Sequence, residues 1–232
     1  MTTAQIDTVN HLIEVRNIGK DYQSGDTTVS AIRDMNFFID DGEFVSIMGQ
    51  SGSGKSTLLS IMGGLNHPSR GSLVIDALDL YQLSSEQRAD FRSEYIGIIF
   101  QSFQLIPYLT VLENVKLPMA ITGVKGARQE QMALEVLGRV GLGGKGNRLP
   151  DQLSGGEQER VAIARAIVNH PPILLADEPT GNLDSHTAEE IMGLLQELNR
   201  EGQTIIMVTH NPESCRYTGR TIEVRDGSCY LP

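Results

Sequence analysis

A glycine-rich segment is the first place where residue types and spacing suggest chemistry. It fits the phosphate-binding pattern G-x-x-x-x-G-K-[ST], and its residues are Gly49, Gln50, Ser51, Gly52, Ser53, Gly54, Lys55, Ser56 and Thr57. Glycines let successive backbone N–H groups converge on phosphate oxygens, and a following helix adds the positive end of its dipole. We expect Lys55 to reach the β- and γ-phosphates of a nucleoside triphosphate, and the Ser56 hydroxyl to bind Mg²⁺.

Two adjacent acids end an apolar run later in the chain. Residues 172–176 are apolar, and Asp177 and Glu178 follow them directly. A continuous apolar run is typical of a parallel strand buried on both faces. Carboxylates at its end are costly unless they are paired or bound to metal. We expect Asp177 to hold Mg²⁺ and Glu178 to polarise an attacking water as a general base.

A second pair of glycines stands at a predicted helix start. Ser154 is a good N-cap, and Glu157 stands at the capping-box distance from it. Gly155 and Gly156 occupy the first turn, where glycine lowers helix stability. An ordinary helix start does not require bare backbone, whereas the close approach of a phosphate does.

Three further polar residues have both a structural and a functional interpretation. Gln101 follows the apolar run 96–100 and either caps that strand or reaches a metal or an attacking water. His210 follows the apolar run 204–209, and a lone histidine at such a place is incidental as often as functional. Tyr22 is either an aromatic residue at a strand edge or a flat surface on which adenine stacks.

Hydrophobic periodicity supplies the elements that must position these residues. The sequence predicts strands at 12–18, 29–39, 43–48, 71–76, 96–100, 172–178 and 204–209, and helices at 56–62, 84–93, 111–117, 127–140, 160–169 and 184–198. Residues 19–28 are expected to form a polar turn between two antiparallel strands. Residues 102–152 have helical spacing and predict a helical insert within an α/β core.

Composition limits the class of protein. The chain has 232 residues, a net charge of −10 and a pI near 4.9, which disfavours nucleic acid and anionic membrane surfaces as partners. Cys215 and Cys229 fit no metal or redox spacing. Residues 1–9 are polar and contain no apolar leader, and every apolar run is far shorter than the ~20 residues that span a bilayer. We therefore expect a soluble cytosolic chain.

Taken in chain order, these motifs resemble the ATPase subunits of ABC transporters over nearly the whole sequence. The most specific part is Leu-Ser-Gly-Gly-Glu at 153–157, followed by Arg-Val-Ala-Ile-Ala-Arg-Ala at 160–166. The resemblance implies that Tyr22 stacks on adenine, that Gln101 contacts Mg²⁺ and water, and that His210 contacts the γ-phosphate. It also implies that Ser154, Gly155, Gly156 and Glu157 form the nucleotide-binding signature, and that Asp184 lies at a dimer seam.

The fold implied by the resemblance is α/β: a P-loop NTPase core with a mainly parallel sheet, an antiparallel β subdomain and an inserted helical subdomain. Residues 1–232 would form one nucleotide-binding domain, with the core and β subdomain at about 1–101 and 159–232, and the helical subdomain at about 102–158. The chain would hydrolyse ATP with Mg²⁺ as a homodimer, in which the phosphate loop of one copy faces the signature of the other.

Three segments narrow the resemblance to the lipoprotein-release, macrolide-export and cell-division ATPases. They are residues 103–107, 109–115 and 180–185. This chain departs from both transport groups. The lipoprotein-release members usually have a histidine pair where this chain has Gln104 and Leu105, which disfavours a lipoprotein substrate. Macrolide exporters fuse ATPase and permease in one chain, whereas this sequence contains no apolar run long enough to span a membrane. Glu159 replaces a more usual glutamine, and we expect it to be exposed and without functional consequence.

The resemblance implies a separate membrane permease as partner, with export or extraction of a substrate driven by transmitted motion. The chain would work on the cytoplasmic face of the membrane, with a membrane-fusion or periplasmic protein as a further partner. Residues 103–107 are expected to line a groove for a permease helix. The alternative is a cell-division-type ATPase that regulates wall hydrolases without cargo. A DNA-repair or translation ATPase is disfavoured, because the segment between Gln101 and Leu153 is too short for a coiled-coil insertion and the chain is acidic.

Overall fold

The protein is described by a computed structural model covering residues 11–25 and 27–230, so the expectation about a leader at residues 1–9 lies outside the described part. Its strands are β1 (Ile13–Ser24), β2 (Thr27–Ile39), β3 (Phe44–Met48), β4 (Arg70–Ile75), β5 (Leu78–Asp79), β6 (Ile96–Ile99), β7 (Ile173–Asp177), β8 (Thr204–Thr209), β9 (Arg220–Arg225) and β10 (Ser228–Tyr230). Its α-helices are α1 (Lys55–Met62), α2 (Ser85–Tyr95), α3 (Val111–Lys116), α4 (Gly126–Arg139), α5 (Gly155–Ile167) and α6 (Ser185–Arg200). Short 3₁₀ turns are η1 (Leu80–Gln82), η2 (Leu117–Ile121), η3 (Pro150–Gln152) and η4 (Ser214–Tyr217).

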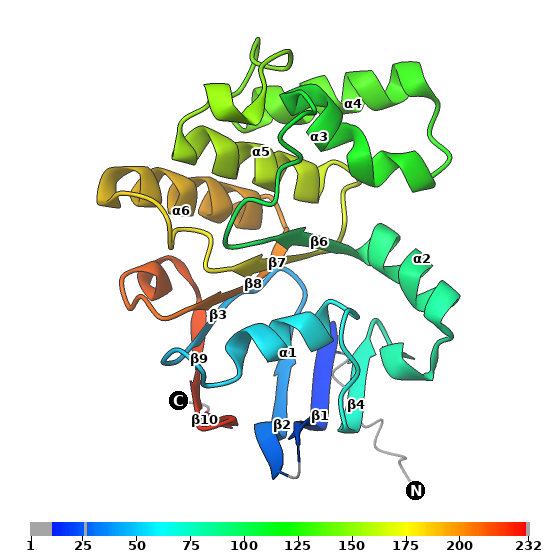
Figure 1. Ribbon diagram of the computed structural model, residues 1–232, viewed down its shortest axis with the longest axis vertical. Helices are drawn as coiled ribbons and strands as arrows, with labels where there is room; N and C mark the ends of the chain where they lie inside the picture. The colour runs from blue at the N-terminus through cyan, green and yellow to red at the C-terminus, as the bar shows by residue number, and fades with distance from the viewer. Residues whose placement is uncertain (1–10, 26, 231–232) are drawn as a thin grey trace, which may run out of the picture.

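A mainly parallel sheet forms the centre of the molecule (Figure 1). It has six strands in the order β10-β9-β3-β8-β7-β6, all parallel except β10. Strand β8 is buried at every position, and β3 and β7 are buried at all but their last residue. The prediction that continuous apolar runs mark doubly covered parallel strands is therefore confirmed. The ends of β3, β7 and β8 bring the phosphate loop, the two acids and His210 to one edge of the sheet.

A second, antiparallel sheet of four strands, in the order β2-β1-β4-β5, lies beside the first. The predicted polar turn at residues 19–28 is wrong, because β1 and β2 continue pairing as far as Ser24 and Thr27. Register shifts between Val15 and Asp21 interrupt the two-residue alternation of side chains, and the far ends of both strands are mostly exposed and polar. Tyr22 consequently lies within β1, opposite Val29.

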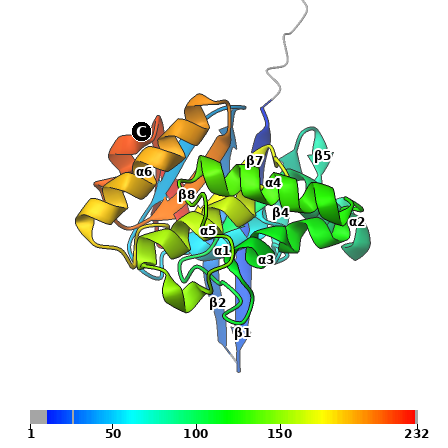
Figure 2. The same cartoon turned by 90° about the horizontal axis from the view of Figure 1, so that it is seen from above.

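Helices α3, α4 and α5 form a layer over one side of the central sheet (Figure 2). Three helix starts have a full capping box, and the boxes pair Ser84 with Gln87, Thr110 with Glu113 and Ser154 with Glu157. The box at Ser154 starts α5 at Gly155, as predicted from the capping pattern, and the helix is continuous with the apolar stretch predicted at 160–169. Helix α5 runs unbroken past residue 158, and the subdomain boundaries stay a prediction.

Strands β9 and β10 were not predicted. Strand β9 pairs in parallel with β3, from Val45 opposite Arg220 to Met48 opposite Glu223, and so runs beside the strand that leads into the phosphate loop. Only Ile222 and Val224 of β9 are buried, which leaves a weak apolar signal among charged residues. In residues 11–25 and 27–230, no helix combines the length and the apolar character needed to cross a membrane.

Candidate active site

The phosphate loop connects β3 to α1 and depends on its glycines. Gly54 has a φ of 101°, in the left-handed region, and a Cβ atom there would lie 2.4 Å from the Ala31 carbonyl oxygen. A Cβ atom on Gly49 would lie 2.2 Å from the Val224 carbonyl oxygen. The loop is therefore clamped between β2 and β9, and its backbone takes a path that larger residues cannot follow.

The Lys55 side chain folds back over this loop. It is only 6% exposed, and its Nζ donates to the carbonyl oxygens of Gly49 at 2.7 Å and Gln50 at 3.0 Å. These two hydrogen bonds hold a positive charge at the mouth of the loop, where helix α1 also begins. The loop, the helix N-terminus and the ammonium group thus combine three features that favour a bound anion.

Ser56 and Asp177 meet beside the loop, although they are far apart in the sequence. The Ser56 hydroxyl donates to Asp177 Oδ1 at 3.1 Å. Burial raises the pKa of the Asp177 carboxyl, the Ser56 hydrogen bond opposes this shift, and the neighbouring Glu178 adds to it. Among the described residues, no group of three or more His, Cys, Asp or Glu side chains is arranged to hold a metal ion by itself. A hydroxyl and a carboxylate next to a phosphate site fit Mg²⁺, which proteins hold with few ligands plus substrate phosphates.

Nine of the 19 predicted site residues line one cavity of about 330 Å³. Its lining comprises Ala31, Ser51, Gly52, Gly54, Lys55, Ser56, Thr57, Gln101, Glu178 and His210. The Gln101 backbone carbonyl accepts from Asn182 Nδ2 at 2.7 Å, so the segment after β6 is tied to the segment after β7. Sequence reasoning did not single out Asn182.

Glu178 and His210 form a pair at the wall of this cavity. Glu178 has a φ of 49°, and its N–H donates to the Val208 carbonyl at 3.0 Å, which fixes the turn after β7. Glu178 Oε1 lies 2.8 Å from His210 Nδ1, and Oε2 accepts from the Thr209 hydroxyl at 3.3 Å. The carboxyl is mostly buried, with 11% of the Glu178 side chain exposed, whereas 62% of the His210 side chain is exposed. A carboxylate held in this way can accept a proton from water.

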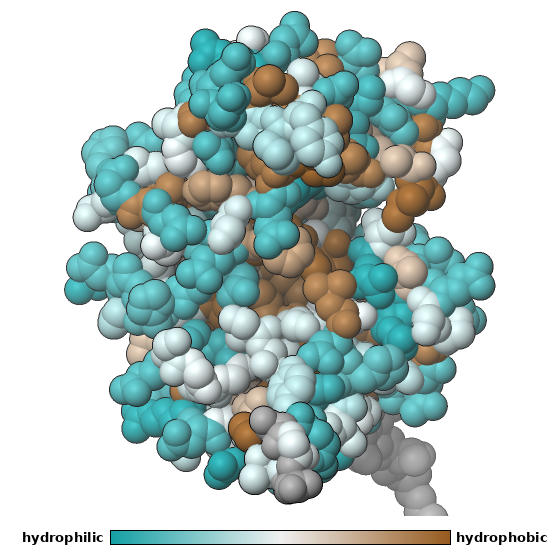
Figure 3. Space-filling view, viewed as in Figure 1, coloured by the Kyte–Doolittle hydropathy of each residue, from teal (hydrophilic) through white to brown (hydrophobic). Residues whose placement is uncertain are grey.

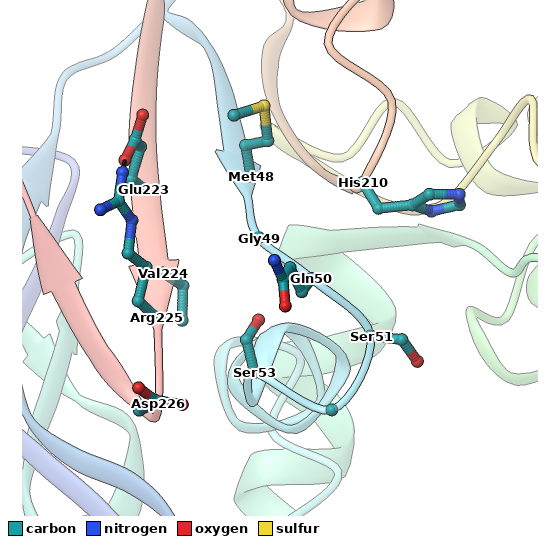
Figure 4. Close-up of a pocket in the computed structure, with 11 residues that line it drawn as sticks. Met48, Gly49, Gln50, Ser51, Ser53, His210, Glu223, Val224, Arg225 and Asp226 are labelled. Atoms are coloured by element: carbon teal, nitrogen blue, oxygen red, sulfur yellow. Dashed lines mark hydrogen bonds and ion pairs between the residues drawn. The ribbon is translucent and has the colours of Figure 1, made fainter.

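A second cavity of about 730 Å³ lies on the other side of the loop. Figure 4 shows Met48, Gln50 and Ser53 on one wall, and Glu223 and Arg225 of β9 on the other. His210 borders both cavities. The wall formed by β9 could not be foreseen, because that strand was not predicted.

The signature segment (residues 153–157) starts helix α5 as expected. The Ser154 N–H donates to Glu157 Oε2 at 3.0 Å, and the Glu157 N–H donates to Ser154 Oγ at 3.3 Å. A hydrogen bond from Lys145 lowers the pKa of Glu157. A Cβ atom on Gly156 would lie 2.3 Å from Thr187 Cγ2, so packing against α6 already requires glycine there. No residue of 153–157 lines either cavity at the phosphate loop.

Asp177 also lines neither cavity, although it contacts Ser56, and two other predicted residues lie outside both cavities. Asp184 is the N-cap of α6, where it accepts from the Thr187 N–H at 3.1 Å and from the Thr187 hydroxyl at 2.6 Å. Tyr22 is 40% exposed and its hydroxyl accepts from Asn66 Nδ2 at 2.7 Å, while Lys20 Nζ lies 5.1 Å from the ring centroid. The structure brings neither residue to the phosphate loop.

The expected exposure of Glu159 is wrong. This residue of α5 is 1% exposed, although nothing in the signature motif marks it as buried. The spacing did contain the signal, because Glu159 stands four residues before the buried Ile163 on the apolar side of the helix.

A phosphate loop after a central parallel strand, two acids at the end of a neighbouring strand and a second glycine-rich helix start define a nucleotide-binding cassette. The chain belongs to the ABC transporter family, whose family model matches residues 32–181. The resemblance and the fold class given by the sequence are thus confirmed. The chain is an ABC-type ATPase, and its cofactors are ATP and Mg²⁺.

Individual relatives agree with this assignment. The chain is 46% identical to the uncharacterized ABC transporter ATP-binding protein YvrO of Bacillus subtilis, over 95% of this chain and 96% of the relative. It is 48% identical to the macrolide export ATP-binding/permease protein MacB of Chlorobium luteolum over 93% of this chain, but covers 32% of that longer protein. The cassette MJ0796, solved as a dimer in a post-hydrolysis state with ADP and Pi, superposes with a TM-score of 0.87 at 44% identity over 94% of this chain and 96% of that one.

Proposed function

We propose that the residues around the phosphate loop carry out ATP hydrolysis in defined roles. Lys55 and the loop N–H groups hold the phosphates, Ser56, Asp177 and Gln101 hold Mg²⁺, and Glu178 accepts a proton from the attacking water. The observation that carries this proposal is the Ser56–Asp177 hydrogen bond of 3.1 Å beside the loop, with the Glu178–His210 pair on the same cavity. Mg²⁺, when bound, would neutralise charge on the phosphates.

Asp177→Asn tests these roles. The amide keeps the size of the side chain and can still accept from Ser56, but it removes the negative charge that favours Mg²⁺. We expect kcat to fall by about tenfold or more, which corresponds to ~1.4 kcal/mol of barrier, and half-maximal activity to need more Mg²⁺. Asp90→Asn, an exposed change on α2, is the matched control. If Asp177→Asn reaches half-maximal activity at the same Mg²⁺ concentration as wild type, the assignment is contradicted.

The second part of the proposal is that one copy supplies only half of each site. The phosphate loop and the signature segment are both glycine-rich helix starts, and both suit an anion. Residues 153–157 line neither cavity beside the loop of their own chain. We therefore assign residues 154–157, together with Asp184, to the ATP that is held by the phosphate loop of a second copy. His210 and Tyr22 are assigned to the γ-phosphate and the adenine.

The third part is that the cassette docks on a separate membrane permease at the cytoplasmic face and drives export or extraction of a substrate. A groove of about 240 Å³ supports this proposal; it is lined mostly by apolar residues of β6 and η2, together with Arg165 and Asn169. Ile121 at its edge is 76% exposed and Leu117 of η2 is 37% exposed. Figure 3 shows apolar side chains over the waist of the molecule at this level. Residues 103–107 do not line this groove, and their contact with a permease helix stays a prediction; the groove adds Ile98, Phe100 and Ile121 as proposed contacts.

Ile121→Asp tests the docking groove. A charge in the apolar groove should prevent insertion of a permease helix, while the distant phosphate loop keeps its basal ATPase activity. The measurement is co-sedimentation with inside-out membrane vesicles of the source organism, before and after protease treatment of the vesicles. We expect wild type and the control Leu134→Asp on α4 to bind only untreated vesicles, and Ile121→Asp to bind neither. Equal binding of Ile121→Asp and wild type would place the contact elsewhere.

A further inference from the structure

Glu159 has an environment that no feature of the nucleotide site explains. Its side chain is 1% exposed, and among the described residues neither carboxyl oxygen has a hydrogen-bond partner. Burial raises the pKa of Glu159 to about 8, and the positive charge of Arg165 acts in the opposite direction. A buried ionised carboxylate without a partner is costly, so this group is mostly uncharged at neutral pH.

The position of Glu159 connects it to the segment that follows Gln101. Glu159 lies one turn after Gly155 on the same face of α5. A Cβ atom on Gly155 would lie 4.0 Å from Phe103 Cζ and 3.4 Å from Leu183 Cδ2. The face of α5 that carries Glu159 is therefore covered by the residues after β6 and by those before α6.

Arg165 holds this segment in place. Its guanidinium donates from Nη1 to the Gln104 carbonyl oxygen at 2.5 Å and from Nη2 to the Phe103 carbonyl oxygen at 2.7 Å. Phe103 and Gln104 have φ values of 58° and 53°, in the left-handed region that is unfavourable for residues with side chains. Backbone hydrogen bonds from the Phe103 N–H to the Phe100 carbonyl and from the Gln104 N–H to the Ser102 carbonyl form the turn, and the two hydrogen bonds from Arg165 add to them at the strained residues.

We propose that Glu159 is a positioning residue for Gln101, and that it acts through its charge on Arg165. While Glu159 is uncharged, the guanidinium stays on the carbonyls of Phe103 and Gln104. When Glu159 ionises, the carboxylate attracts the guanidinium more strongly than neutral carbonyls do, and residues 101–104 are released. The inference rests on the proposed role of Gln101 at the metal and the attacking water.

Other charges do not replace Arg165 in this arrangement. Residues 101–107, β6 and η2 carry no titratable side chain. The charged side chains on the other elements packed against α5 are exposed or half-exposed, and they are Glu113, Lys116, Arg128, Glu130, Glu135, Arg139, His186, Glu189, Glu190, Glu197 and Arg200. The segment before α6 carries Glu178, which pairs with His210, and Asp184, which caps α6. On α5 itself, Glu157 contacts Lys145, and Arg160 contacts Glu190.

Hydrogen exchange at residues 103–105 against pH tests the proposal in the full-length ATPase. In wild type we expect the protection factors, corrected for intrinsic exchange, to fall by about tenfold as Glu159 ionises, the scale of one hydrogen bond to a charged group. Glu159→Gln, which cannot ionise, should keep its protection over the same range. Arg165→Met should have low protection at every pH. The kcat of wild type should fall above about pH 8 relative to that of Glu159→Gln.

Two results would overturn the inference. One is the same pH dependence of protection in wild type and in Glu159→Gln, with thermal melts showing that both are folded. The other is a Glu159 carboxyl ¹³C signal that titrates near the ordinary pKa of 4.5. Gln101→Ala separates this inference from the proposed function. If Gln101→Ala has a normal kcat while wild-type protection still falls with pH, the role of Gln101 fails and the coupling of Glu159 to Arg165 stands.

Discussion

Lys55 shows how a single side chain can be prepared for a ligand by the fold. Its ammonium donates to two carbonyl oxygens of the phosphate loop, at 2.7 Å and 3.0 Å. Because the side chain is 94% removed from solvent, with 6% exposed, little conformational freedom is left to lose when ATP binds.

Lys55→Ala is therefore expected to weaken ATP binding strongly. Hydrogen bonds to charged groups contribute about 1.5–3 kcal/mol each, so the dissociation constant should rise roughly 10- to 100-fold. Lys125→Ala removes an exposed lysine at the start of α4 and should bind ATP as wild type does. Calorimetric titration with ATP makes the comparison, and equal affinities in the two variants would argue against a phosphate role for Lys55.

Helix α5 combines the signature segment at its start with a buried acid near its middle. Between the ordinary pKa of 4.5 and the folded value of about 8, the folded chain binds a proton at Glu159 that the unfolded chain has lost. The unfolding free energy contributed by this group therefore falls as pH rises through that window. The stability that the protonated group contributes is fully present below the lower value and is lost above the upper one.

Glu159→Gln should remove this dependence. The unfolding free energy of wild type should fall by roughly 3 kcal/mol between about pH 5 and about pH 8 relative to that of Glu159→Gln, since one pKa unit corresponds to 1.36 kcal/mol. Glu130→Gln, an exposed change on α4, should gain none. Urea denaturation at the two pH values measures the difference, and parallel pH profiles for wild type and Glu159→Gln would show that Glu159 is not a buried acid.

Elements with strong local signals were predictable from sequence. The apolar runs predicted the central strands β3, β7 and β8, because strands buried on both faces are continuously apolar. The glycine-rich loop after β3 predicted the phosphate-binding part of the site. Strands β9 and β10 were missed because few of their residues are apolar. The strands at 12–18 and 29–39 were predicted, but the far end of the β1–β2 ladder was predicted as a turn because bulges break its alternation.

The contacts between distant segments were harder to foresee. Nothing local places Asn182 on the Gln101 carbonyl or Arg165 on the carbonyls of Phe103 and Gln104, because these contacts form only when the loops after β6 and β7 meet α5. Tyr22 is a different case. The family resemblance implies that its ring stacks on adenine, whereas in the structure its hydroxyl contacts Asn66 and Lys20 lies over its ring. Its role in binding adenine stays a prediction.

At the scale of the whole molecule, the separation of the two glycine-rich helix starts is the main constraint. Residues 153–157 line neither cavity at the phosphate loop, which supports the proposal that one chain supplies only half of each ATP site. A two-fold dimer would complete both sites at once. With a net charge of −10, each copy repels the other, so that loss of the γ-phosphate after hydrolysis would favour separation.

The most direct test of this shared site is the oligomeric state of Glu178→Gln with and without ATP. The amide keeps the size of the side chain but cannot accept the proton from water, so bound ATP should persist and hold the two copies together. We expect a monomer without nucleotide and a dimer in saturating Mg²⁺-ATP on a sizing column, together with wild-type specific activity that rises with protein concentration. A Glu178→Gln variant that stays monomeric in saturating ATP, with wild-type activity independent of concentration, would contradict the shared site.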